Sequence, residues 1–352
     1  MRPDEELLIA AAGTAKGGPT LAIGGTAAFV EALVHSGRTV SWLPLDVRET
    51  GDAPDGITIL PDPGMPLGAD DRFAEVIFPA SPERDLGRRW LVMARNHLAP
   101  GGRVILAGAN ATGIRSTIAD GVSLFGTPFR EDYRSKQRVA TFVPDAQPVA
   151  DPAWTTQPGI AEGTWDKVDL LLDGAALTIA TLPGVFAGSR LDLGTELLLA
   201  HLELEPGERV LDVGCGAGAI GFTVWRRMGG TGAVVMTDVN LLAVASVRET
   251  IRRAAMSSVR AVAGDVYDGL GAGERFDLIV SNPPFHQGKT VDLAMPQRLI
   301  GDAAQHLVPG GRLVIVANAF LPYERLLEER FRVVKELANT RRFKVLLAIR
   351  SR

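Results

Sequence analysis

Hydrophobic residues along the chain fall into short apolar runs that alternate with stretches of helical spacing. In the first half, the pattern predicts strands at residues 20–25, 39–43, 73–78 and 103–107 and helices at 27–35 and 88–98. In the second half, it predicts strands at residues 210–213, 233–238, 259–262, 276–280, 313–317 and 343–349 and helices at 220–227, 241–255 and 295–307. Strands that alternate with helices indicate an α/β protein with a parallel sheet.

The pattern breaks between residues 141 and 163, where prolines stand at positions 144, 148, 152 and 158. Such a proline-rich stretch is typical of a linker. The chain has 352 residues, and single hydrophobic cores usually stop growing before this size. The sequence therefore predicts two domains, residues 1–150 and residues 151–352.

The two halves look like copies of one another. Residues 96–105 match residues 305–314 around a shared Pro-Gly-Gly, and residues 71–77 resemble residues 274–280. Generic turn chemistry could produce one such match, but two in the same order favour a duplication. The first copy has Gly24-Gly25-Thr26 where the second has a full glycine loop. We therefore expect the first domain to keep the fold and to lack the site.

Composition is that of an ordinary globular protein, with 46% hydrophobic and 22% charged residues and a net charge of −4. No apolar run is long enough to span a membrane, and the first residues do not resemble a signal peptide. One cysteine, Cys215, excludes an internal disulfide framework and a cysteine-based metal cage. We expect a cytoplasmic protein with no membrane or metal partner.

Two short basic stretches stand out against the negative net charge. They are residues 130–138 and residues 341–344, with Arg350 and Arg352 near the second. Charge alone favours interpreting each of them as a solvated face. A nucleic-acid partner would need a local basic patch of this kind.

The strongest candidate for chemistry in the second half begins at a glycine loop. Asp212 lies near the end of the predicted strand 210–213, which is followed by Gly214, Gly216 and Gly218, and glycine permits close approach of a ligand. Asp238 ends the next strand, the position of an acid that binds ribose hydroxyls, and Asp265 follows the strand after that. A dinucleotide or S-adenosylmethionine would fit these residues. An acid beside the loop suits a ligand with an amino group, which favours S-adenosylmethionine.

The stretch Ser281-Asn282-Pro283-Pro284-Phe285 follows the predicted strand 276–280 directly. Two prolines cannot continue a sheet, so the chain must leave the sheet there. In open α/β sheets, ligands bind at this carboxyl edge. The first copy has Phe78-Pro79-Ala80-Ser81-Pro82 at the equivalent position, so the fold alone does not require Asn-Pro-Pro-Phe.

These motifs resemble those of class I S-adenosylmethionine-dependent methyltransferases, in which Asn-Pro-Pro-[Phe/Tyr] serves methylation of planar amino nitrogens. Four stretches together resemble the RsmC/RlmG family of ribosomal RNA guanine-N2 methyltransferases: 182–186, 191–195, 282–288 and 343–346. The resemblance implies two tandem Rossmann-like domains with mostly parallel seven-stranded sheets, the N-terminal one degenerate and supporting RNA binding. It also implies methyl transfer to the exocyclic N2 of a guanine in ribosomal RNA, with small-subunit RNA favoured.

The resemblance also implies roles for single residues. The Asn282 side-chain oxygen and the Pro283 carbonyl would accept the N–H groups of the guanine amine, and Phe285 would stack on the flipped base. Asp192 would pack over the methionine end of the cofactor, together with Thr195. The implied partner is ribosomal RNA or a ribosomal subunit. A duplicated chain can act as its own pseudo-dimer, so we expect a monomer.

Other functions remain open at this point. Asn-Pro-Pro-Phe also serves methyltransferases of adenine-N6 in DNA and of glutamine side chains in proteins. A cofactor-binding RNA assembly factor without catalysis is an alternative from a different class. The first domain could instead be a second catalytic unit, although nothing near Pro79 corresponds to Asn282.

Overall fold

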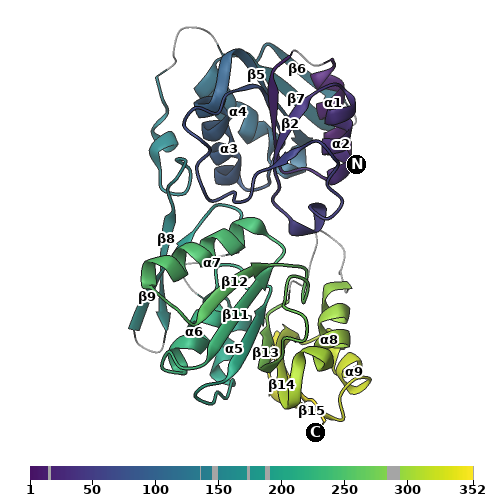
Figure 1. Ribbon diagram of the computed structural model, residues 1–352, viewed down its shortest axis with the longest axis vertical. Coiled ribbons are helices and arrows are strands. Elements are labelled where there is room, and N and C mark those ends of the chain that lie inside the picture. Colours follow the sequence, from purple (N-terminus) through teal and green to yellow (C-terminus); the bar gives the residue numbers. More distant parts are fainter. Residues whose placement is uncertain are drawn as a thin grey trace. The chain divides into compact units, whose positions relative to one another are not determined.

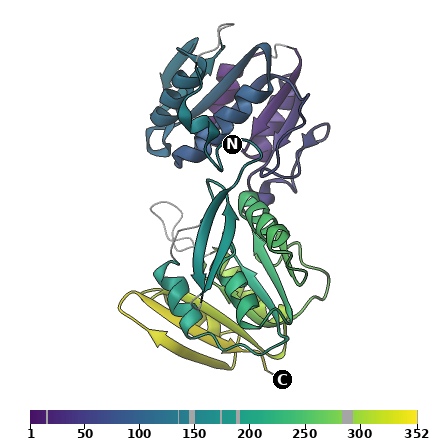
Figure 2. The ribbon, with the colours of Figure 1, turned by 90° about the vertical axis from the view of Figure 1, so that its left-hand side faces the viewer.

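A computed structural model describes residues 1–14, 17–134, 136–144, 150–172, 175–186, 191–283 and 294–351. Its contacts divide the chain into a first unit, residues 1–166 with 182–184, and a second unit, residues 167–181 with 185–352 (Figures 1 and 2). This division lies later in the chain than the boundary at 150 that the prolines suggest. Residues 153–164 pack on the first unit, where Arg89 donates to the carbonyl of Gly159 at 2.8 Å and His97 lies 3.0 Å from the Glu162 carboxylate.

The first unit contains a seven-stranded sheet in the order β3-β2-β1-β4-β5-β7-β6. Its strands are β1 (Pro19–Ile23), β2 (Thr39–Leu43), β3 (Thr58–Ile59), β4 (Phe73–Pro79), β5 (Leu98–Ala109), β6 (Arg130–Arg134) and β7 (Gln137–Phe142). β7 pairs antiparallel with both β5 and β6, and all the other strand pairs of this sheet are parallel. The helices are α1 (Pro3–Ala12), α2 (Ala27–His35), α3 (Arg84–His97) and α4 (Ile114–Phe125), with 3-10 turns at Val47–Glu49, Asn110–Thr112 and Ala153–Thr156. In Figure 1, α1 and α2 lie on one side of the sheet and α3 and α4 on the other.

The second unit repeats this architecture in the order β12-β11-β10-β13-β14-β16-β15. Its strands are β10 (Arg209–Val213), β11 (Ala233–Asp238), β12 (Val259–Ala263), β13 (Phe276–Ser281), β14 (Leu307–Asn318), β15 (Val333–Asn339) and β16 (Phe343–Ile349). Its helices are α5 (Leu193–Ala200), α6 (Ala219–Arg227), α7 (Leu241–Ala254), α8 (Ala294–His306) and α9 (Tyr323–Glu328). A separate two-stranded sheet pairs β8 (Asp166–Leu172) with β9 (Ala175–Thr181). The two identical strand orders confirm the predicted pair of α/β domains.

Each Pro-Gly-Gly lies inside a long strand and forms a bulge there. In the second unit, Phe276 pairs with Leu307, but Leu278 two residues later pairs with Arg312. The first unit has the same irregularity between β4 and β5. The middle glycine adopts φ +81° at position 310, a backbone conformation that a Cβ disfavours. The shared bulge supports the duplication that the sequence suggests.

Most predicted elements are confirmed within one or two residues, because a continuous buried face marks each of them. β13 and α8, for example, pack together in one core through Ile279, Leu299 and Ile300, all at most 1% exposed. Three boundaries differ more: α3 begins at Arg84, β5 at Leu98 and β14 at Leu307, so each Pro-Gly-Gly belongs to a strand. Elements without a strong apolar pattern, such as the edge strand β6, were not predicted.

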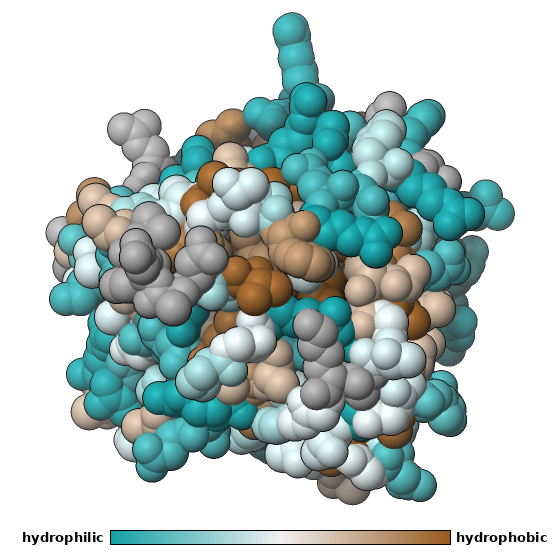
Figure 3. All heavy atoms as spheres, turned by 90° about the horizontal axis from the view of Figure 1, so that it is seen from above, coloured by the Kyte–Doolittle hydropathy of each residue, from teal (hydrophilic) through white to brown (hydrophobic). Residues whose placement is uncertain are grey.

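The surface is mixed in character. Figure 3 shows one face, on which hydrophobic residues lie in small patches between hydrophilic ones. None of the helices in the described part of the chain is long and apolar enough to cross a membrane.

Candidate active site

The candidate site lies at the carboxyl ends of the central strands of the second unit. β10 pairs in parallel with β11 on one side and with β13 on the other, so Val213 lies between Thr237 and Ser281. Asp238 and Asn282 are the next residues along those neighbouring strands. Parallel pairing therefore brings the glycine loop, Asp238 and Asn282 to one edge, as the sequence predicts.

The glycine loop turns sharply from β10 into α6. Gly214, Gly216 and Gly218 have φ angles of +71°, +53° and +89°, all in the region that side chains disfavour. The Asp238 carboxylate accepts the Gly216 N–H at 2.9 Å and the Asn240 N–H at 2.8 Å. Asp238 thus fixes the loop against the end of β11 and stands where an acid can also meet ribose hydroxyls.

Asp212 lies beneath the loop and is completely buried. Its Oδ2 accepts the Gly221 N–H at 2.9 Å, whereas Oδ1 has no hydrogen-bond partner among the described residues. Burial raises the pKa of Asp212 to about 7; the Gly221 N–H opposes this rise and the charge of Asp238 adds to it. An unpartnered buried carboxylate oxygen suits a nearby positive charge such as an ammonium group.

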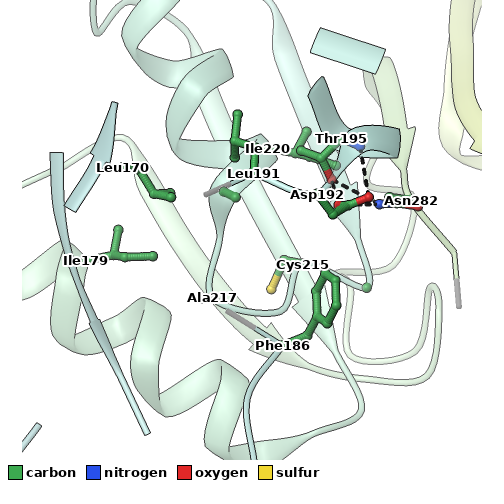
Figure 4. Close-up of a pocket in the computed structure, with 12 residues that line it drawn as sticks. Leu170, Ile179, Phe186, Leu191, Asp192, Thr195, Cys215, Ala217, Ile220 and Asn282 are labelled. Carbon is green, nitrogen blue, oxygen red and sulfur yellow. Dashed lines mark hydrogen bonds between the residues drawn. The ribbon is translucent and has the colours of Figure 1, made fainter. Parts of the chain in front are cut away.

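Asp192, Thr195 and Asn282 form a hydrogen-bonded group across the site (Figure 4). Asn282 Nδ2 donates to Asp192 Oδ2 and to Thr195 Oγ1, each at 3.0 Å. Asp192 is also the N-cap of α5, since Oδ1 accepts the Gly194 N–H at 2.9 Å. The amide nitrogen of Asn282 is therefore held by two acceptors, and Oδ1 remains an acceptor without a partner among the described residues.

A cavity of about 260 Å³ opens beside this group (Figure 4). Of the predicted site residues, Asp192, Thr195, Gly214 and Asn282 line it. Its other walls are mostly apolar and come from several elements: Leu170, Ile179, Phe186, Leu191, Cys215, Ala217, Ala219 and Ile220. An apolar cavity with a few convergent polar groups is typical of a cofactor site.

The other predicted site residues do not line the cavity. Asp212 and Asp238 support the glycine loop, as described above. Asp265 pairs with Arg298 of α8, with 3.0 Å between the carboxylate and the guanidinium. Pro283 follows Asn282 and is buried. Phe285 lies outside the described residues, so its expected role in stacking stays a prediction.

The walls from β8 and β9 were not predicted. Ala180 N–H donates to Thr250 Oγ1 of α7 at 2.9 Å, which holds β9 against the second unit. Leu170 and Ile179 then face the cavity. The sequence carries a signal for this hairpin, because the dipeptide Asp173-Gly174 stands between two apolar runs.

In the first unit, carboxylates of the chain itself bind the N–H groups at the start of α2. Glu5 is completely buried and its carboxylate accepts the Thr26 N–H at 2.8 Å, at the start of α2. Glu49 accepts the Ala27 N–H at 3.0 Å. These carboxylates occupy helix N–H groups that would otherwise attract an anionic part of a ligand. This agrees with the degenerate character expected of the first domain.

The strand order, the glycine loop with its two acids and the Asn-Pro at the end of β13 together define an S-adenosylmethionine-dependent methyltransferase of class I. Within the described residues, no group of three or more His, Cys, Asp or Glu side chains could hold a metal ion. The model of the family called methyltransferase small domain matches residues 176–347.

Curated relatives narrow this class to one family. The ribosomal RNA small subunit methyltransferase C of Erwinia tasmaniensis is 37% identical over 260 residues, 72% of this chain and 69% of that protein. The protein of the same name from Chromohalobacter salexigens is 42% identical over 198 residues, which span 54% of this chain and 56% of that protein. The chain therefore belongs to the ribosomal RNA small subunit methyltransferase C family.

A solved structure resembles the whole chain. The Thermus thermophilus 16S rRNA N2 G1207 methyltransferase (RsmC), in complex with AdoMet and guanosine, superposes with a TM-score of 0.82 at 28% identity. The match covers 99% of this chain and 92% of that one, so it includes both units. The predicted family and fold are thereby confirmed.

Proposed function

We propose that this chain transfers a methyl group from S-adenosylmethionine to the exocyclic N2 of a guanine in small-subunit ribosomal RNA. Membership of the family supports this activity, as does the likeness along both units to a guanine-N2 methyltransferase. The observation that carries the proposal is the fixed amide of Asn282 at the mouth of the cofactor cavity.

The chemistry explains why that amide matters. The lone pair of the guanine amine is delocalised into the ring, so the amine is a poor nucleophile and offers two N–H donors. Asn282 Oδ1 is left as an acceptor for one of them, because Asp192 and Thr195 hold Nδ2. The Pro283 carbonyl is the expected second acceptor. Two fixed acceptors would orient the amine and stabilise the positive charge that develops on its nitrogen.

The cavity and the acidic residues near it fit the cofactor. We infer that the glycine loop and Asp192 hold its methionine end, that Asp238 binds the ribose, and that Asp265 reaches the base. The unpartnered Oδ1 of buried Asp212 lies beneath the loop, where the ionised carboxylate would complement the ammonium and sulfonium groups. When bound, S-adenosylmethionine supplies an electrophilic methyl group. The apolar walls exclude water from that group.

Methyl transfer to unmodified small-subunit ribosomal RNA tests the proposal. We expect N2-methylguanine in the RNA, and none of the methyl label in DNA or in protein glutamine. Label in adenine or glutamine would favour the other planar-amine substrates. Cofactor binding without any transfer would favour an assembly factor.

We also propose that the chain acts as a monomer in the cytoplasm, where ribosomal RNA is modified. A duplicated fold supports the monomer, since each sheet already has a counterpart within the chain. Sedimentation of the purified chain would test it, and a stable dimer at micromolar concentration would contradict it.

A further inference from the structure

The last hairpin of the second unit turns at the same edge of the sheet as the candidate site. In this hairpin, Phe343 at the start of β16 pairs with Asn318, the final residue of β14. The other end of the hairpin, where Val333 pairs with Ile349, lies at the opposite edge. The turn at residues 340–342 therefore belongs to the ligand-binding edge.

This turn is held rigidly. Thr340 N–H donates to the Phe343 carbonyl at 2.7 Å, and its Oγ1 accepts the Phe343 N–H at 2.8 Å. The Arg342 carbonyl accepts the Ala319 N–H at 2.9 Å, which ties the turn to the loop that follows β14. The next residue in that loop, Phe320, is 68% exposed. A backbone bond thus holds the loop that carries this exposed aromatic beside the turn.

Two guanidinium groups project from this turn into solvent. Arg341 and Arg342 are exposed, and no described carboxylate forms an ion pair with either of them. Two acidic side chains near the turn have other partners: Glu324 binds Lys344 at 2.5 Å and Glu336 accepts from Asn339 at 2.9 Å. The turn therefore presents two arginines without an ion-pair partner among the described residues, on a chain whose net charge is −4.

A short series of contacts connects the turn to Asn282. The Phe343 ring packs over the first turn of α5, where its Cε1 lies 3.5 Å from the position of a Cβ on Gly194. Gly194 N–H donates to Asp192, whose carboxylate holds the Asn282 amide. A nucleotide next to one bound at Asn282 would therefore meet the surface beside the turn.

The first unit carries the same feature. Its hairpin β6–β7 turns where Gln137 pairs with Ala109, the final residue of β5. Arg134 and Lys136 are exposed there. The Arg138 guanidinium lies 5.0 Å from the centre of the exposed Tyr133 ring, as Arg342 lies 5.2 Å from that of Phe343. The first unit lacks the full glycine loop of the second yet keeps a basic turn at the equivalent place.

We propose that both hairpin turns bind the phosphate backbone of the RNA substrate, and that Phe320 stacks on an unpaired base next to the target. This inference rests on the proposed transfer to RNA. Arginine and lysine supply the phosphate contacts, and an exposed aromatic supplies sequence-tolerant stacking. The combination fits single-stranded RNA, in which the target base is already out of a helix.

Three double variants, one of them a control, test whether the two turns bind RNA. Arg341→Ala with Arg342→Ala removes the charge of the second turn, and Arg134→Ala with Lys136→Ala removes that of the first. Arg330→Ala with Arg332→Ala is the matched control, because both arginines are exposed at the opposite end of the hairpin β15–β16. Binding of an unmethylated small-subunit ribosomal RNA transcript is measured over a series of salt concentrations, and cofactor affinity is measured alongside.

Each turn variant should bind the transcript about tenfold more weakly, with the slope of log Kd against log salt reduced by roughly 1.4, since each contact to a single strand contributes about 0.7. The control should keep the wild-type slope. Phe320→Ala should weaken binding without changing the slope, because stacking releases no counterions.

Equal slopes for the turn variants, the control and the wild type would overturn the inference. A turn variant that binds the transcript normally but binds assembled subunits more weakly would also overturn the inference. That result would assign the turns to a protein partner. If the wild-type chain methylates the RNA, these outcomes leave the proposed function intact. If it methylates no RNA, the proposed function itself fails.

Discussion

Thr195 is the residue whose role can be tested with the smallest change. Its hydroxyl accepts from Asn282 Nδ2 at 3.0 Å, and the side chain is 5% exposed. Thr195→Val keeps the shape but removes one of the two acceptors, so Asp192 alone would hold the Asn282 amide. We expect kcat to fall roughly 10- to 100-fold, as for other small misplacements of reacting groups.

Thr195→Ser is the matched control for that experiment. It keeps the hydroxyl and should retain most of the activity. Steady-state kinetics on unmethylated RNA would distinguish the two variants. Equal activity of the valine and serine variants would show that the hydroxyl does not position Asn282.

Asp212 gives the protein a specific dependence on pH. Folding raises its pKa from the ordinary 3.8 to about 7, so the native state binds this proton more tightly than the unfolded chain does. The contribution of Asp212 to the free energy of unfolding should therefore be most favourable below pH 4 and should decline as the pH rises toward 7. Asp212→Asn should remove this decline, because asparagine keeps an acceptor for Gly221 and does not ionise.

Thermal unfolding of the wild type and of Asp212→Asn between pH 5 and 8, with and without S-adenosylmethionine, measures this dependence of stability on pH. Positive charge on the cofactor should favour ionised Asp212, so the cofactor should stabilise the wild type more at pH 8 than at pH 6. The same pH profile for wild type and Asp212→Asn would contradict this assignment.

At the scale of elements, the glycine loop can be tested by adding a methyl group. Gly216 has φ +53°, and a Cβ there would lie 2.8 Å from the Phe186 carbonyl oxygen. Gly216→Ala should lower the free energy of unfolding by about 1–2 kcal/mol through backbone strain and should also disturb the loop that forms the cavity. We expect a large loss of cofactor affinity.

Gly207→Ala is the control for strain alone. Gly207 has φ +85° with no atom within 4 Å of an added Cβ. This variant should lose a similar amount of stability and keep its cofactor affinity. Calorimetric titration with S-adenosylmethionine checks both variants, and normal affinity for Gly216→Ala would contradict the role of the loop.

The sequence predicts the inner elements of both units well and the outer ones poorly. β10 and β11 carry continuous apolar runs, because both of their sides are covered. α6 carries an apolar face, because that face packs on the sheet. β15 has exposed or half-exposed residues at every position, so its pattern carries no period that would predict an edge strand.

The sequence likewise predicts part of the candidate site and misses the rest. Asp212, Asp238 and Asn282 could be found because each follows an apolar run that fixes its place at the sheet edge. The bond between Asp192 and Asn282 joins residues 90 positions apart in the sequence, and no local pattern reports it. The sequence does not predict the pairing of Asp265 with Arg298 either, because these two residues also lie far apart in the chain.

At the scale of the whole molecule, the two units should differ in cofactor binding. Glu5 and Glu49 occupy the first N–H groups of α2, whereas the second unit has an open cavity beside its glycine loop. We expect one S-adenosylmethionine per chain in a calorimetric titration. A second binding event that survives Gly216→Ala would contradict a degenerate first unit.

The central claim is that Asn282 directs a guanine amine toward the methyl group of the cofactor. The most direct test incubates wild type and Asn282→Ala with unmethylated small-subunit ribosomal RNA and S-adenosylmethionine, and counts N2-methylguanine by mass spectrometry. The wild type should produce it, and Asn282→Ala should be slower by about 10² to 10³, the usual cost of removing one fixed group that stabilises developing charge. Full activity of Asn282→Ala, or methylation by the wild type of any base other than guanine, would contradict the account.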